Sequence, residues 1–161
     1  MSKNFYSTVA FSLAFSFMLV GCGTASESSD NSIELTKQNC EDYLKIGGNI
    51  GVDGYKVKSD WYGDFYDHIV GKVVVNGANS NFIYNDVVVT VNLSGTYDSY
   101  DWLLKKMKDN IDFSYTVTVK CNTGGNGSES FAVQIADYTA QDELNIGYQI
   151  VDVTGTVTVA K

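Results

Sequence analysis

The chain has 161 residues, 19 of them acidic and 11 basic, and carries a formal net charge of −8 at pH 7. Every basic residue is lysine, so no guanidinium group is available to bind phosphate or carboxylate in bidentate fashion. The acidic balance argues against nucleic acid as a partner, because binding to it depends on neutralising phosphates with positive side chains.

The N-terminal segment has the features of a removed bacterial export signal. Lys3 precedes the apolar stretch Val9–Val20, which is too short to span a bilayer well. Its last residues, in Leu19-Val20-Gly21-Cys22, resemble a bacterial lipobox. The resemblance implies cleavage before Cys22 and a diacylglycerol on the Cys22 sulfur, which would anchor the chain in the cell membrane or the outer membrane on its extracytoplasmic side. An ordinary secretory signal cleaved after Ala25 and an uncleaved hydrophobic anchor are the alternatives.

The rest of the chain predicts one domain. We expect residues 1–21 to be a lipoprotein signal peptide, residues 22–32 the lipidated cysteine with a flexible tether, and residues 33–161 a single domain. The 140 residues left after cleavage keep 10 of the 11 lysines and all 19 acidic residues, for a formal charge of −9.

A short helix is expected at the start of the domain, over residues 35–44. Thr36 stands where it could cap the helix, and Cys40, Tyr43 and Leu44 share one face by their spacing. Gly47 and Gly48 are expected to end it.

After this point apolar residues recur with a period of two, which indicates strands with one buried face. Strands are expected at residues 69–75, 87–94, 112–121, 131–136 and 146–159. A change of apolar phase at Ile150-Val151 predicts a bulge or a break in the last one. Hairpin turns are expected at Gly124–Gly127 and at Asn76-Gly77, where a longer loop up to Asn81 is equally compatible.

This pattern predicts a mainly β fold, an antiparallel immunoglobulin-like β-sandwich with a short N-terminal helix. The segments Gly71–Asn76 and Asn85–Val91 resemble parts of the small bacterial lipoprotein sandwich domains of the FxLYD kind. That resemblance implies the same architecture and carries no catalytic residues.

The cysteines predict one disulfide. If Cys22 is lipidated, Cys40 and Cys121 are the only pair left for an intrachain bond, and both lie on faces predicted to point inward. Outside the reducing cytoplasm such a bond would stabilise the fold by roughly 4 kcal/mol. Two buried free thiols are the alternative.

The sequence gives no catalytic or metal-binding set. His68 is the only histidine, and no nucleophile motif such as Gly-x-Ser-x-Gly accompanies it. Two isolated cysteines and one histidine also lack the paired spacing of zinc sites. We therefore expect no enzyme, no cofactor and no metal.

Two aromatic segments supply candidate ligand-binding residues. In residues 60–67, aromatic side chains alternate with carboxylates and could stack on sugar rings; the candidates are Trp61, Tyr62, Phe65 and Tyr66. In residues 97–108, expected as a short helix or a long inter-strand excursion, Trp102 would be an anchor for a ligand or a protein if exposed. The lysines that follow could contact anionic lipid or an acidic partner. The alternative is that these rings fill the core and the lysines form a solvated edge.

Together these features predict a membrane-anchored extracytoplasmic lipoprotein with a non-enzymatic binding module, whose partner is an envelope or extracellular protein or a glycan. One alternative is a glycan-binding module that uses the candidate aromatic residues. Another is an acidic inhibitor of a cationic envelope-degrading enzyme, which the net charge would steer to its target.

Overall fold

The computed structural model describes residues 31–58, 65–101, 103–136, 138–139 and 144–159. The predicted signal peptide, Cys22 and most of the tether lie outside these residues. The elements in chain order are β1 (Ser32–Glu34), α1 (Cys40–Tyr43), β2 (Leu44–Lys58), β3 (Phe65–Gly77), β4 (Phe82–Asp101), β5 (Lys106–Lys120), β6 (Gly127–Ala136), β7 (Tyr138–Thr139) and β8 (Asn145–Val159).

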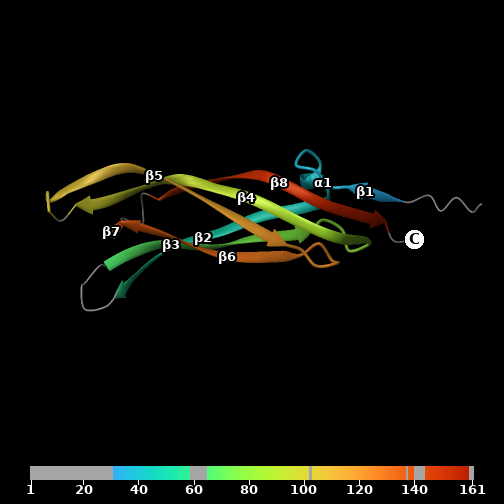
Figure 1. Ribbon diagram of the computed structural model, residues 1–161, viewed down its shortest axis with the longest axis horizontal. Coiled ribbons are helices and arrows are strands. Elements are labelled where there is room, and N and C mark those ends of the chain that lie inside the picture. Colours follow the sequence, from blue (N-terminus) through green and yellow to red (C-terminus); the bar gives the residue numbers. More distant parts are fainter. Residues whose placement is uncertain (1–30, 59–64, 102, 137, 140–143, 160–161) are drawn as a thin grey trace, which may run out of the picture.

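The strands form two antiparallel sheets that lie one over the other (Figure 1). The first, here called the β4 sheet, has the order β1-β8-β4-β5, with β7 pairing to the end of β4. The second, the β3 sheet, has the order β2-β3-β6. The prediction of a mainly β, antiparallel fold is confirmed.

The core lies between the two sheets and follows the period of two. The inward residues in the middle of β4 are at most 1% exposed: Val87, Val89, Val91 and Leu93. The opposite sheet contributes the buried residues Ile69, Val73 and Val75. Alternation therefore identified the buried faces correctly, because successive side chains of a strand point to opposite faces.

The predicted irregularity in the last strand is a bulge. Thr90 pairs with Asp152 and Val91 pairs with Ile150, so Val151 is an extra residue in β8. Its side chain is exposed, whereas Ile150 and the next inward residue, Val153, are buried. Because of this extra residue, the inward positions change from even-numbered to odd-numbered residues of β8, which explains the shift in the apolar pattern.

The N-terminal helix is shorter than predicted. Only one turn, Cys40–Tyr43, is helical, and the side chain of Asn39 accepts a hydrogen bond from the backbone N–H of Thr36. Leu44 already has extended backbone angles and pairs with Gly77 of β3. Gly47 and Gly48 consequently lie inside β2, because strand pairing with β3 takes precedence over the local helical spacing.

The hairpin turn predicted at Asn76-Gly77 is wrong, because both residues pair with β2 at the end of β3; the alternative, a longer loop up to Asn81, is correct. The turn predicted at Gly124–Gly127 does reverse the chain. Both reversals connect strands of different sheets. The segment 121–126 leads from β5 in the β4 sheet to β6 in the β3 sheet, and Ala78–Asn81 leads from β3 to β4. The Asn122 side chain accepts hydrogen bonds from the N–H groups of Gly124 and Asn126, which closes the first of these turns. Turn residues in a sequence mark a reversal, but they do not specify whether the flanking strands pair with each other.

The predicted disulfide is absent, because Cys40 and Cys121 are both free thiols. Cys40 follows β1 and Cys121 follows β5, which are the opposite edges of the β4 sheet. β8 and β4 separate these two edges, so the strands next to the two cysteines do not pair with each other. Two inward-facing cysteines therefore need not be neighbours.

The molecule is elongated along its strands (Figure 1). β1, α1 and the C-terminal end of β8 lie at one end. The turn between β4 and β5 lies at the other end, where β2 finishes and β3 begins. The β4–β5 turn is thus remote from the N-terminal strand.

Candidate functional site

The side chains of the five candidate ligand-binding aromatic residues lie outside the described part of the chain. Trp61, Tyr62 and Trp102 lie outside the described residues. Phe65 and Tyr66 begin β3, and their side chains are likewise outside the description. Sugar stacking on these rings therefore stays a prediction.

His68 lies within the β3 sheet. In register it stands between Asp53 of β2 and Gln134 of β6, and its side chain is partly buried. Among the residues that the structure describes, no group of three or more histidine, cysteine or acidic side chains could hold a metal ion.

The segment 97–108 forms the end of a long hairpin, and neither the predicted helix nor the predicted excursion is correct. β4 continues to Asp101, which pairs with Lys106 at the start of β5. Tyr97 and Ser99 keep their inward positions and are buried, so the strand alternation extends further than the apolar pattern indicated. We call Asp101 together with Leu103–Lys108 the distal tip.

The carboxylate of Asp101 organises the distal tip. One of its oxygens accepts hydrogen bonds of 3.0 Å from the backbone N–H groups of Leu103 and Leu104. The other oxygen lies 3.2 Å from the Nζ atom of Lys108. The hydrogen bond from Leu104 lowers the pKa of Asp101, and the hydrogen bond from Lys108 lowers it further. The turn is therefore held by the charged form of the carboxyl group.

A second acidic residue, Asp98, also binds the backbone of the hairpin, a few residues before the turn. The Asp98 side chain accepts a 2.6 Å hydrogen bond from the backbone N–H of Asn110. The strand register shifts there, and Asn110 has a positive φ of 57°. Two carboxylates thus fix the backbone on both sides of the hairpin end.

This backbone presents apolar side chains to solvent. Leu103 is 91% exposed and Leu104 is 67% exposed, the two highest values among the exposed large hydrophobic residues of the described chain. Lys105, Lys106 and Lys108 surround them and are exposed too. A shallow hollow of about 390 Å³ beside Leu104 offers surface and not an enclosed pocket. Sequence reasoning considered the lysines here and missed the leucines, although two adjacent leucines between strand patterns were visible.

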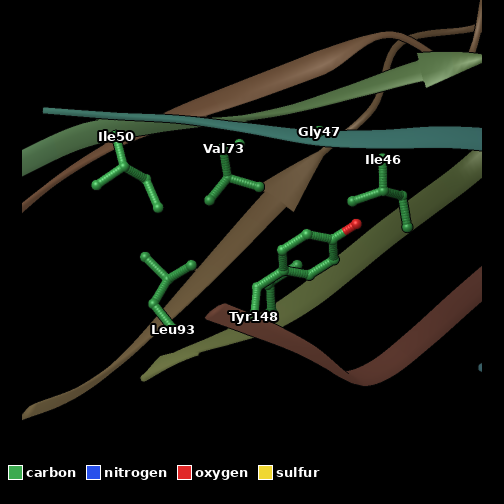
Figure 2. Close-up of a pocket in the computed structure, with 8 residues that line it drawn as sticks. Ile46, Gly47, Ile50, Val73, Leu93 and Tyr148 are labelled. Carbon is green, nitrogen blue, oxygen red and sulfur yellow. The ribbon is translucent and has the colours of Figure 1, made fainter. Parts of the chain in front are cut away.

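A second feature is a narrow apolar slot on the open side between the sheets (Figure 2). Figure 2 shows the Tyr148 ring pointing from β8 toward Ile46 of β2. The slot has a volume of about 10 Å³, which is about one water molecule, so it cannot hold an organic ligand in this form. Its lining residues are Ile46, Gly47, Gly48, Ile50, Val73, Val91, Leu93 and Tyr148.

No family model, curated protein or solved structure matches this chain. The described part contains no helix that is long and apolar enough to cross a membrane.

Proposed function

We propose that this protein is a membrane-anchored extracytoplasmic lipoprotein whose immunoglobulin-like β-sandwich is a non-enzymatic binding module that engages its partner through the distal tip. The observation that carries the proposal is the exposure of Leu103 and Leu104 on a fixed turn at the end opposite β1. Exposed leucines on an ordered turn cost solvation without contributing to the core, which a binding role explains.

The lipobox supports this orientation. If Cys22 carries the lipid, the nine residues 23–31 before β1 reach at most about 30 Å. β4 has 20 residues and is about 66 Å long at roughly 3.3 Å per residue. The lipid would hold the β1 end near the membrane, and the distal tip would stand at the far end of the rigid sheets.

The tip defines the chemistry of its partner. Burying both leucines would contribute about 3–6 kcal/mol, and the lysines around them favour a surface that carries negative charge. Lys108 is paired with Asp101, and Asp109 lines the same hollow, so Lys105 and Lys106 supply the remaining positive charge of the tip. The expected partner is an envelope component with an apolar patch bordered by acidic groups.

The anchor is tested by metabolic labelling of bacteria that produce the full chain, using an alkyne fatty acid. We expect the wild-type protein to be labelled and the Cys22→Ser variant to lose the label. Labelling that persists in Cys22→Ser, or is absent from the wild type, would contradict lipidation at this residue.

Binding through the tip is tested by crosslinking the full chain in its native cell envelope and comparing Leu103→Asp/Leu104→Asp with the wild type. Ile83→Asp is the matched control, because Ile83 is also an exposed apolar residue, at 44%, but lies at the other end of β4. We expect a specific crosslinked species that the tip variant loses and the control keeps. Flotation with phosphatidylglycerol vesicles would show whether that species is lipid. Equal capture by both variants would exclude the tip as the binding site.

A further inference from the structure

Among the described residues, no strand pairs with one edge of β2. It pairs with β3 without interruption from Leu44 to Asp53, and it is the outermost strand of the β3 sheet. Such an edge exposes unpaired N–H and C=O groups, which natural proteins usually protect with proline, charged residues or bulges. The chain contains no proline, the register of β2 shifts only after Asp53, and the charged residues of this stretch, Lys45 and Asp53, stand at its two ends, so residues 46–52 carry none of these features. The edge is therefore open to another strand.

Neither space nor backbone conformation requires glycine at three positions of this edge. A Cβ atom on Gly47, Gly48 or Gly51 would meet its nearest neighbour at 3.9–4.0 Å, an ordinary contact, and none of the three has a positive φ. On the neighbouring strand, by contrast, a Cβ atom on Gly71 would lie 2.6 Å from a backbone oxygen. At their positions these glycines leave the two faces of the edge without bulky side chains, so the backbone of the edge is uncovered there.

The open side next to this edge is apolar. Ile46 and Ile50 are only partly buried, and Tyr148 across the slot is 50% exposed (Figure 2). A strand added to β2 would cover these side chains and satisfy the free backbone groups at the same time.

We propose that the added strand is β2 of a second copy of this chain, paired antiparallel about a twofold axis through Asn49. In this register Ile46 stands opposite Val52, Gly47 opposite Gly51, and Gly48 opposite Ile50. Lys45 precedes Asn49 by four residues and Asp53 follows it by four, so each lysine stands opposite an aspartate of the other copy. The two sheets join as β6-β3-β2-β2-β3-β6.

Charge complementarity favours β2 of a second copy as the added strand. The register matches opposite charges twice, once on each side of the axis, as a self-complementary twofold interface requires. If one copy of β2 were shifted by one residue, its apolar side chains would point to the opposite face of the joined sheet. Only registers that differ by an even number of residues keep the apolar side chains of both copies on the same face. Copies of net charge −8 repel one another at long range, and the local lysine–aspartate pairs oppose that repulsion where the strands meet.

The test is cysteine crosslinking of the full chain in the cell envelope. Asn49→Cys would place two cysteines opposite each other on the twofold axis, within the range of Cα separations that a disulfide spans. With copper–phenanthroline as oxidant we expect a dimer on a non-reducing gel. Gln149→Cys, an exposed position on β8, is the matched control and should give at least tenfold less dimer.

Charge reversal tests the register. In the Asn49→Cys chain, Lys45→Asp alone or Asp53→Lys alone places like charges opposite each other and should reduce the dimer at least fivefold. The double variant restores opposite charges and should recover it. Circular dichroism and a thermal melt verify that each variant is folded. Absence of the dimer in folded Asn49→Cys, crosslinking to a different protein, or no recovery in the double variant would each overturn the proposal.

Discussion

The hydroxyl group of Tyr84 donates a hydrogen bond of 2.7 Å to the backbone carbonyl of Tyr43. The same hydroxyl accepts a bond of 3.1 Å from the N–H of Ala78, which in turn donates to the Tyr43 carbonyl. Tyr84 belongs to β4, whereas Tyr43 immediately precedes β2, so this partly buried network joins the two sheets near the β1 end.

Replacement of Tyr84 by Phe should destabilise the protein by about 1 kcal/mol, because the bond to Tyr43 is lost while Ala78 still satisfies that carbonyl. The free energy of unfolding, measured in urea, checks this value. Tyr148→Phe is the control, since Tyr148 is half exposed and should change stability by less than about 0.5 kcal/mol. Equal losses in the two variants would argue against the network.

Two glycines of the β3 sheet should respond differently to alanine. A Cβ atom on Gly71 would lie 2.6 Å from the backbone oxygen of Asn49 and 2.8 Å from the Cα atom of Ile50. Backbone must move to accept it, and we expect Gly71→Ala to cost about 1–3 kcal/mol. Gly47→Ala meets only ordinary contacts and should be neutral or slightly stabilising. Urea unfolding of both variants measures the difference, and a tolerated Gly71→Ala would show that β2 and β3 are less tightly paired.

Cys40 and Cys121 should both be recovered as free thiols. Burial raises the pKa of each thiol above its ordinary value of 9.0, and nearby Glu41 adds to the effect at Cys40. The reactive species is the thiolate, so native-state alkylation at pH 8 should be slow and should accelerate as the pH rises. Cys121 should react first, because it is only partly buried whereas Cys40 is inaccessible to solvent.

Peptide mass spectrometry after unfolding in iodoacetamide, without reductant, provides the decisive measurement. Both cysteines should be alkylated, and a reductant should leave the unfolding midpoint unchanged. A peptide pair linked through Cys40 and Cys121 would restore the disulfide predicted from the sequence.

The distal tip should loosen in acid. The folded-state pKa of Asp101 lies below its ordinary value of 3.8, first because Leu104 donates its N–H and then because Lys108 binds the carboxylate. The resulting stabilisation of the turn is complete above the ordinary pKa and is lost as the pH falls through the lowered one. The amide proton shifts of Leu103 and Leu104, followed by NMR, should therefore titrate with a midpoint below 3.8.

Two variants test whether the carboxyl group of Asp101 causes this titration. Asp101→Asn should abolish it, whereas Lys108→Ala should move the midpoint upward but keep it below the ordinary value, because the bond from Leu104 is the larger cause. A midpoint at the ordinary value in the wild type would mean that the carboxylate does not hold the turn.

The sequence by itself determined which residues are buried along the strands and where β8 departs from regularity. Both properties are local: the alternation of Val87, Val89, Val91 and Leu93 fixes a face, and the phase change at Ile150-Val151 requires an extra residue. The resemblance to a lipobox before Cys22 is local in the same sense, and the proposed membrane location rests on it alone.

Tertiary structure decided every relationship between distant segments. Strand order places β1 and β5 at opposite edges, which leaves Cys40 and Cys121 unpaired although both lie on predicted inward faces. Pairing with β3 draws Leu44 and the glycines after it into a strand in place of a helix. Leu103 and Leu104 became recognisable as a candidate binding surface only when the hairpin placed them beyond the end of both sheets, because exposure depends on which strands cover a residue and not on the residue itself.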